Sequence, residues 1–498
     1  MAAKCAKLAL FLSLLVSLAL CVSSLWAAEE ATADAAGPSP NDRPVIADTM
    51  DGVAVADATD GAGMSDGPDR AAINDGPDRA AMNEGPDCPA VAAAAPDDCQ
   101  SGVCCGCPCG PAGRFWMRAD ALLWWTKGSR LPPLVTTSPA GTPAFDPQTG
   151  TPLAGALTPA ANTTVLFGDS VVNDRFRAGP DITMGLWLDC CNTWGIEGDY
   201  FDLGRQNTSY DSGLSNGSTI LARPFFNTEF GYPDAELAAF PGELAGQVTA
   251  QASTEFHSAG FDFRHNLYCQ ECCPHACECG DGCGGCAAPC CNCCPSSFRL
   301  DAIAGYRNYD LSDDLAVEEN LITTGGPTQV GTQINVTDSF HTRNAFNGMD
   351  LGLIGNAYYG CWSWQVSAKA ALGWENQAVT INGSTVVTTP DGTVATSQGG
   401  LLALQTNIGT YSRNEFVVIP ELGMEVGYQI TPHLRGFFGY NFLYWGDVAR
   451  AGDQVTLNID PRNLPGAPRT GAGPQPAFTF NDTSFWAQGI RLGAELRY

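Results

Sequence analysis

The most regular feature of the sequence is an alternation of apolar and polar positions with a period of two. From Phe115 to Trp125 every second residue is apolar, and Arg118 and Asp120 lie between them. Successive side chains of a β-strand point to opposite faces, so this pattern predicts a strand with one apolar and one polar face. The same pattern predicts ten strands in all, at 115–125, 181–190, 194–203, 254–268, 298–309, 346–357, 362–373, 416–430, 434–445 and 486–498.

The connections between these strands alternate between short and long. Very short turns such as 431–433 join three of the strand pairs, whereas segments rich in Thr, Asn, Gly and Pro form the long connections 127–180, 204–252, 310–345, 374–414 and 446–484. Short periplasmic turns, long extracellular loops and strands of about 9–11 residues are typical of outer-membrane barrels. We therefore predict an all-β fold, an antiparallel transmembrane β-barrel of ten to twelve strands, with an extra loop hairpin at 385–394. A secreted soluble β-protein is the alternative.

The ends of the predicted strands favour the membrane alternative. Aromatic residues collect at membrane–water interfaces, and here they include Trp124, Trp125, Trp362, Trp374, Tyr444 and Trp445. The last strand carries alternate apolar residues up to Tyr498, with Gly493 and Leu496 before it. This ending resembles the C-terminal signal that the bacterial barrel-assembly machinery reads. We therefore expect that machinery and outer-membrane lipid as partners.

The N-terminal residues predict export from the cytoplasm. Lys4 and Lys7 precede an apolar run, and small residues follow at Ala27 and Ala28, which indicates a signal peptide over 1–28. A lipoprotein with a lipidated Cys21 is the alternative. Residues 29–113 form a segment rich in Ala, Asp, Gly and Pro that contains a nine-residue Asp-Gly-Pro-Asp repeat and ends in a Cys-rich stretch. Such a segment cannot bury a core, so we expect it to be disordered and the barrel to occupy 114–498.

The net charge excludes one class of partner. The chain has 25 Lys+Arg against 53 Asp+Glu, a formal charge of -28. A nucleic-acid-binding protein needs a basic patch, so we expect no nucleic-acid partner. Residues 29–100 hold 16 acidic residues and 3 Arg, so about half of the excess negative charge lies outside the predicted barrel.

Several short motifs lie in or beside the predicted strands. They are 114–125 (RFWMRADALLWW), 194–201 (WGIEGDYF), 304–307 (AGYR), 342–348 (TRNAFNG), 420–428 (PELGMEVGY), 439–444 (GYNFLY) and 450–454 (RAGDQ). Together they resemble the beta-barrel porin-7 family, a family of outer-membrane barrel porins common in planctomycete bacteria. The resemblance covers roughly 114–498. It implies a barrel in the bacterial outer membrane, with no catalytic residues to carry over.

Charged residues on the polar strand faces are predicted to line the barrel lumen. The candidates are Arg118, Asp120, Glu197, Asp199, Arg299, Asp301, Arg307, Glu421, Glu425, Arg435, Arg491 and Glu495, and further residues of this face are Asp189, Asp262, Arg264, Lys369 and Arg497. A polar lumen predicts a narrow porin for passive diffusion of small solutes. An interior filled with ion pairs is the alternative, because ten to twelve strands leave less room than a wide porin does. An acid/base couple formed by Glu421 and Glu425 is a minor alternative. We expect neither enzymatic activity nor a cofactor.

The 22 cysteines of the chain indicate cross-linking at one side of the barrel. On the predicted topology those after the signal peptide lie at the periplasmic side, and residues 269–294 form a Cys-rich insertion there. We favour disulfides over a metal site, although Cys269 and Cys272 have zinc-ligand spacing. A structural envelope protein, cross-linked through this face to the cell wall or to neighbouring Cys-rich proteins, is therefore the alternative function. The candidate cysteines are Cys104, Cys105, Cys107, Cys109, Cys190, Cys191, Cys269, Cys272, Cys273, Cys277, Cys279, Cys283, Cys286, Cys290, Cys291, Cys293, Cys294 and Cys361.

Overall fold

The computed structural model describes residues 113–189, 192–272, 296–468 and 470–498. The chain divides into two units, 1–88 and 89–498, and all described residues belong to the second. The predicted signal peptide and acidic repeats lie outside the described residues.

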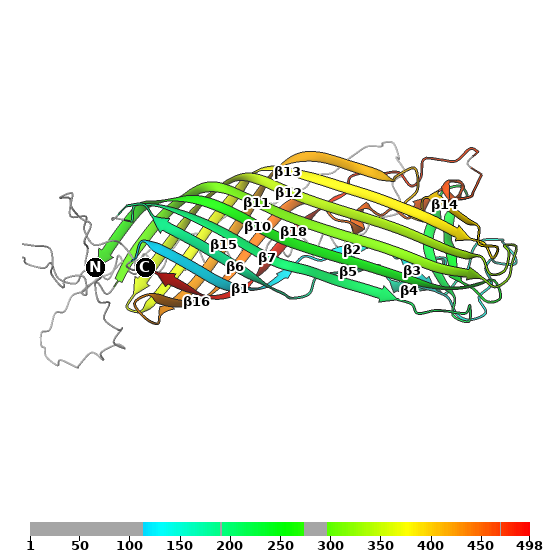
Figure 1. Cartoon of the computed structure of the whole chain (residues 1–498), viewed down its shortest axis with the longest axis horizontal. Helices are drawn as coiled ribbons and strands as arrows, with labels where there is room; N and C mark the ends of the chain where they lie inside the picture. Colours follow the sequence, from blue (N-terminus) through cyan, green and yellow to red (C-terminus); the bar gives the residue numbers. More distant parts are fainter. Residues whose placement is uncertain (1–112, 190–191, 273–295, 469) are drawn as a thin grey trace, which may run out of the picture. The chain divides into compact units, whose positions relative to one another are not determined.

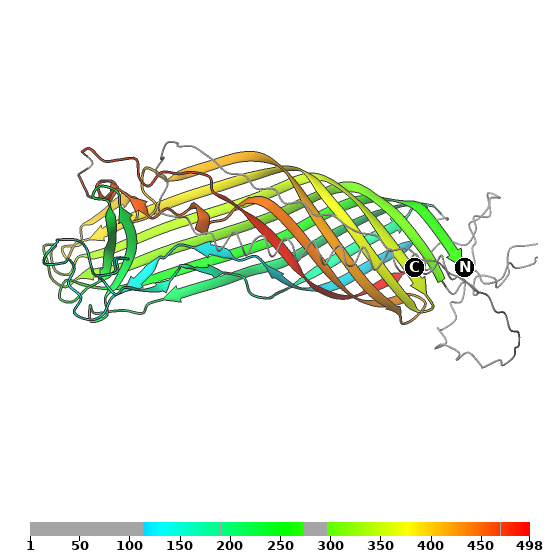
Figure 2. The same ribbon diagram turned by 180° about the vertical axis from the view of Figure 1, so that it is seen from behind.

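Ten long antiparallel strands form a closed barrel (Figures 1 and 2). Each strand pairs with the next along the chain, and the last strand pairs with the first from Trp116 opposite Arg497 to Thr126 opposite Ala487. The ring is β1 (Phe115–Thr126), β6 (Arg177–Trp187), β7 (Trp194–Asp211), β10 (Leu244–Cys272), β11 (Ser296–Thr323), β12 (Gln333–Tyr359), β13 (Trp362–Thr388), β15 (Gly409–Gln429), β16 (Leu434–Ala449) and β18 (Asp482–Arg497).

The ten predicted strands are therefore confirmed, as is the all-β fold. The loop hairpin is confirmed as well, because β13 continues through a turn at 389–393 into β14 (Val394–Gln398), which pairs back with it. Helical structure in the described segments amounts to two short 3-10 turns, η2 (Gly452–Gln454) and η3 (Pro461–Asn463). No helix among these residues is long and apolar enough to cross a membrane.

The predicted strand lengths are wrong at the loop ends. The strands extend to as many as 29 residues, and most of the predicted loop 310–345 belongs to β11 and β12, which leaves a connection of only 324–332. The reason is visible on β13. Trp362 to Trp374 face outward as an apolar series, but Asn376, Thr380 and Asn382 continue that same face as polar residues. The outer face of the strand changes from apolar to polar after Trp374, so the alternation that predicts an apolar outer face ends there although the strand continues.

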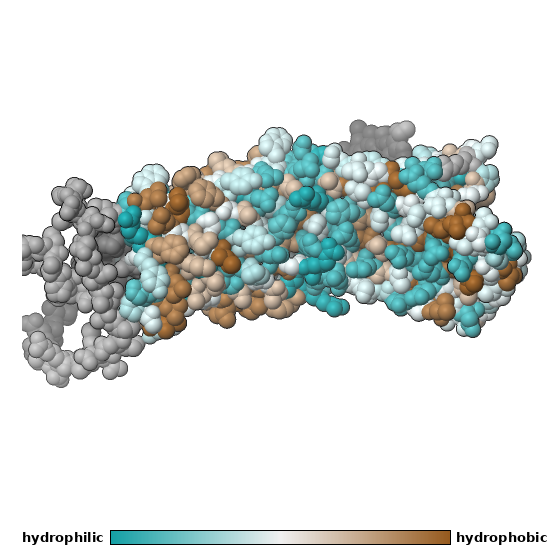
Figure 3. All heavy atoms as spheres, viewed as in Figure 1, coloured by the Kyte–Doolittle hydropathy of each residue, from teal (hydrophilic) through white to brown (hydrophobic). Residues whose placement is uncertain are grey.

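The apolar outer surface forms a band at the end of the barrel near the C-terminus (Figure 3). Two pairs of aromatic residues mark its edges on adjacent strands, Trp362 with Tyr428 and Trp374 with Phe416. Twelve residues separate Trp362 from Trp374, and a rise of about 3.3 Å per residue at a tilt of about 45° gives ~28 Å. This height matches the hydrocarbon core of a bilayer, about 30 Å.

Only some of the aromatic residues predicted for the membrane interfaces lie at the edges of this band. Trp125, Trp362 and Trp374 are exposed on the outer wall, as predicted. Trp124 and Trp445 are not, because their side chains point into the barrel and are at most 2% exposed. For these two residues the prediction is wrong. Their parity along the strand, which is that of Arg118 and Arg435, already places them inside.

The long connections fold into small sheets at the opposite end of the barrel. One sheet contains β3 (Val135–Thr137), β4 (Thr164–Phe167), β8 (Leu221–Asn227), β9 (Tyr232–Ala239) and β17 (Asn458–Ile459), and β2 (Ser129–Leu131) pairs with β5 (Ser170–Val172). We call the first of these the loop sheet. Leu221, Phe225 and Ala238 of the loop sheet pack in one buried cluster with Val317 of β11 and Phe340 of β12. The loop sheet therefore fills this end of the barrel.

The outer surface generates a prediction about membrane stability. Ala368 faces outward on β13 midway between Trp362 and Trp374, whereas Asn382 faces outward on the same strand beyond the apolar band. We expect Ala368→Arg to lower the free energy of unfolding by about 2–4 kcal/mol, because it places a charge at the bilayer centre. The matched variant Asn382→Arg changes it by less than about 0.5 kcal/mol. Denaturant titration in lipid vesicles measures both, and equal effects would contradict the placement of the band.

Candidate functional site

All ten barrel strands contribute charged side chains to the lumen at the level of the apolar band. The pairs described below come from β1, β6, β7, β10, β11, β12, β13, β15, β16 and β18. The inward direction follows from the period of two, because the neighbouring residues of each strand form the apolar outer face. We call this set of residues the lumen network.

The first part of the lumen network lies beside the seam between β1 and β18. Arg118 pairs with Glu425, which also accepts from Arg435 at 2.6 Å. Arg435 reaches Glu495 at 3.1 Å, and Arg497 pairs with the same carboxylate. Two carboxylates thus bridge three arginines across four strands. All five side chains are at least four-fifths buried, so these charges depend on each other for compensation.

The second part crosses from β18 to β13. Arg491 Nε donates to Asp120 at 2.6 Å, and its Nη2 lies 3.2 Å from Asp181. Arg307 pairs with Asp199, with Asp350 at 2.9 Å and more distantly with Asp262.

Asp262 is a distinctive member of this part. It is fully buried, and Lys369 Nζ lies 3.8 Å from it. Neither of its carboxylate oxygens has a hydrogen-bond partner within the described residues. Its two nearest cations, Arg307 at 3.6 Å and Lys369 at 3.8 Å, therefore lie beyond hydrogen-bond distance.

The third part lies nearest the short turns. Arg264 pairs with Asp301 at 2.8 Å and with Glu197 at 3.2 Å, while Arg299 shares Asp301 at 2.7 Å. The guanidinium of Arg299 lies over the ring of Trp187, 4.2 Å from its centre, and donates to the backbone oxygen of Asn192. This arrangement anchors the β6–β7 turn to the lumen.

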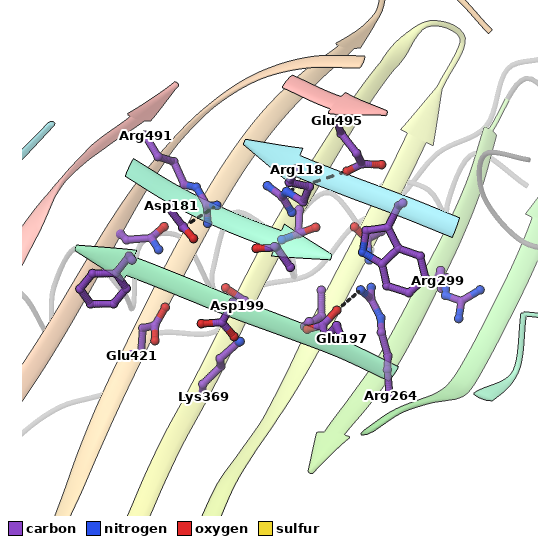
Figure 4. Close-up of a pocket in the computed structure, with 18 of the residues that line it drawn as sticks. Arg118, Asp181, Glu197, Asp199, Arg264, Arg299, Lys369, Glu421, Arg491 and Glu495 are labelled. Atoms are coloured by element: carbon purple, nitrogen blue, oxygen red, sulfur yellow. Dashed lines mark hydrogen bonds and ion pairs between the residues drawn. The ribbon is translucent and has the colours of Figure 1, made fainter. Parts of the chain in front are cut away.

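A polar cavity of about 90 Å³ lies within the lumen network, large enough for a few water molecules. Figure 4 shows Asp181, Arg491, Asp199, Lys369 and Glu421 directed toward it from different strands. The lining contains both cationic and anionic groups. Such a lining suits small polar or zwitterionic solutes better than ions of a single sign.

The cavity is bounded on its loop side by a layer of aromatic rings that sequence analysis did not predict. This aromatic layer consists of Trp124, Phe201, Phe256, Tyr309, Phe346, Trp445 and Phe485, each at most 7% exposed. Trp445 of β16 lies 6.0 Å from Tyr309 of β11 and 6.4 Å from Phe346 of β12, measured between ring centres. These strands lie on opposite walls, so the rings close the lumen. The sequence does contain a signal for these rings. They occupy inward-facing positions of the alternating pattern, at the depth where the outer face becomes polar.

Each charged lumen candidate lies in the lumen network or on its cavity. Glu421 and Glu425 have different partners. Glu425 pairs with two arginines, whereas Glu421 accepts a hydrogen bond from the Tyr309 hydroxyl at 3.2 Å. Asp189 was wrongly expected in the lumen. It lies in the β6–β7 turn, where it accepts from the backbone N–H groups of Thr193 and Trp194 at 2.8 Å.

The residues of the predicted assembly signal lie at the β18 end of the barrel. Tyr498 is exposed and its ring stacks on His433, while Leu496 faces outward. A Cβ atom at Gly493 would lie 2.7 Å from the ring of Phe437 and 2.6 Å from the backbone oxygen of Ala119. Close packing at the closing seam therefore requires glycine there, whether or not the assembly machinery reads this position.

Two candidate cysteines have described side chains. Cys269 on β10 and Cys361 in the β12–β13 turn both lie at the short-turn end, and both are disulfide-bonded. Cys272 ends β10, and its side chain is not described. The remaining candidates, namely Cys104, Cys105, Cys107, Cys109, Cys190, Cys191, Cys273, Cys277, Cys279, Cys283, Cys286, Cys290, Cys291, Cys293 and Cys294, lie outside the described residues. The wider cross-linking hypothesis stays a prediction.

Comparisons with known proteins identify a family. A family model described as "Putative beta barrel porin-7" matches residues 116–498. No curated protein matches the chain. Among solved structures, the chain is similar to the outer membrane protease OmpT from Escherichia coli, with 9% identity, 77% of this chain and 97% of that chain covered, and a TM-score of 0.33. It is also similar to a Pseudomonas aeruginosa FadL homologue, with 10% identity, 77% and 90% covered, and a TM-score of 0.20. At these scores neither structure informs the function of this chain.

The lumen network generates a prediction about stability. We expect Glu495→Gln to lower the free energy of unfolding by about 3–5 kcal/mol, because it leaves Arg435 and Arg497 buried without their shared counter-charge. The control Glu255→Gln breaks the exposed pair with Arg205 and costs about 0–1 kcal/mol. Denaturant titration of both variants in vesicles tests this. Similar small losses would show that the network does not need full pairing.

Proposed function

The chain belongs to the beta barrel porin-7 family, and we propose that it is an integral outer-membrane protein whose barrel is closed to diffusion in this conformation. The closed ten-stranded ring, the ~28 Å apolar band and the aromatic residues at its edges support insertion into a bilayer. Family membership supports the outer membrane as its location. In this proposal 1–28 directs export, and the barrel-assembly machinery recognises the strand that ends at Tyr498.

One observation carries the closed state. The lumen is occupied at three successive levels, by the lumen network, by the aromatic layer and by the loop sheet. Each buried aromatic pair contributes about 0.5–1.5 kcal/mol beyond its burial. A solute would have to displace several such contacts at once. This filling supports a structural envelope protein, with the barrel as a membrane anchor.

The short-turn end supports the same role. Cys269 and Cys361 lie there, and the predicted Cys-rich insertion 269–294 connects β10 to β11 at that end. In the oxidising periplasm such cysteines form disulfides readily. We propose that this end is cross-linked, within the chain or to neighbouring Cys-rich proteins or the cell wall. Catalysis is not part of this proposal.

A narrow porin is the second candidate function. The family description and the mixed-charge cavity support it, because a polar lumen suits small solutes. Conduction then requires a conformation in which the aromatic layer and the loop sheet have moved. The two candidates therefore differ in whether such a conformation is populated.

Electrical recordings separate the two functions. We expect the full-length protein, reconstituted in planar bilayers, to give no stepwise conductance at voltages up to 100 mV. A heat-dependent shift in gel mobility on the same sample shows that the barrel is folded. Repeated unitary steps from the folded protein would overturn the structural proposal and support the porin. Absence of the gel shift would overturn the barrel itself.

A further inference from the structure

One buried arginine links the loop sheet to the barrel wall, beside the apolar cluster that packs the two together. Arg223 of β8 is 0% exposed. Its Nη1 donates to Glu319 of β11 at 2.7 Å, and its Nη2 lies 2.7 Å from Asp338 of β12. Both acceptors belong to wall strands beyond the apolar band, at the end where Figures 1 and 2 show the short strands of the loops. The arginine therefore connects a loop hairpin to two wall strands.

Asp338 also fastens a second loop to the same point. Its carboxylate accepts from the backbone N–H of Ala403 at 2.7 Å and of Leu402 at 3.1 Å. Asp338 therefore connects the β8–β9 hairpin and the loop 402–403 to the same point of β12.

Glu236 adds a negative group that this cluster does not balance. It lies on β9 directly opposite Arg223 in the hairpin register. Its Oε2 atom is shielded from solvent and has no hydrogen-bond partner among the described residues. Glu236 itself is half-buried, whereas Glu319 and Asp338 are buried. With all three ionised, three carboxylates lie around one guanidinium, and the cluster carries two excess negative charges. Burying such an excess is unfavourable, and binding one proton relieves it.

We propose that the proton on Glu236 controls the docking of the β8–β9 hairpin in the mouth of the barrel. With the proton bound, the hairpin stays against β11 and β12, and loss of the proton releases it. This control is independent of whether the barrel conducts. It concerns only the contact between the loop sheet and the wall strands β11 and β12.

The direction of the pH dependence follows from the groups that face Glu236. They are Arg223 from β8, Glu319 from β11 and Asp338 from β12. Burial, and then the charge of Glu319, raise the pKa of Glu236 to about 8, against the opposing effect of Arg223. Below its ordinary pKa of about 4.5 the carboxyl is protonated whether the hairpin is docked or released, so docking is at full strength. Docking weakens as the pH rises from about 4.5 to about 8, by up to about tenfold in its equilibrium constant per pH unit, and the loss is complete once the pH has passed about 8.

Hydrogen exchange of the full-length barrel in detergent micelles tests this proposal. Amide exchange of residues 221–239 is compared between the wild type and Glu236→Gln at pH 4.5 and at pH 9. Comparison at equal pH removes the intrinsic pH dependence of exchange. We expect the two proteins to exchange within about threefold of each other at pH 4.5, where Glu236 is protonated in the docked hairpin and about half protonated in the released one. At pH 9 the wild-type hairpin should exchange at least about tenfold faster, because the amide side chain cannot ionise.

A matched control variant and a folding check complete the experiment. Glu243→Gln makes the same change at an exposed position just after β9, and we expect it to follow the wild type at both pH values. The heat-dependent gel shift confirms that each variant forms the barrel. A ratio of exchange rates between the wild type and Glu236→Gln that is the same at pH 4.5 and pH 9 would overturn the proposal. So would a hairpin that stays fully protected at pH 9.

Discussion

The pairing of β1 with β18 is the constraint on which the rest of the structure depends. In a bilayer every backbone N–H and C=O group needs a partner within the protein, and a sheet with open edges leaves two rows unpaired. The register from Trp116–Arg497 to Thr126–Ala487 supplies those partners. Because the ring closes after ten strands, the width of the bore is set. Gly493 lets the seam close without a clash against Phe437.

A bore set by ten strands has to be filled from within, and it is filled differently at each depth. Within the apolar band the interior holds paired charges, which stay favourable only while every partner is present. Where the outer wall becomes polar the interior becomes aromatic. At the mouth the loops supply a small sheet of their own. The mouth is therefore held by one apolar cluster and one charge cluster, whereas the bore is held by contacts from all ten strands.

The strands and the loop turn could be predicted from the sequence because they depend on local periodicity. Features that change with depth along the barrel axis could not. Residues 362–373 showed the alternation clearly, and Pro390, Asp391 and Gly392 indicated the loop turn. Strand ends and the places of Trp124 and Trp445 were predicted wrongly, because the outer face becomes polar toward the loop end, as on β13, and large apolar side chains there point inward. Glu236 could not be predicted, since its environment comes from β8, β11 and β12. Those strands meet only through tertiary folding.

The change from apolar to polar on the outer face of β13 also determines which membranes suit this protein. Between Trp362 and Trp374 the outer wall tolerates hydrocarbon, and from Asn376 onward it does not. A hydrocarbon layer thicker than ~28 Å would have to thin around the barrel or cover amide side chains, at fractions of a kcal/mol for each ångström of mismatch. The rigid filled bore prevents the barrel from deforming to relieve that cost. The protein is therefore matched to a bilayer whose hydrocarbon core is close to this height, and a markedly thicker bilayer would have to deform around it.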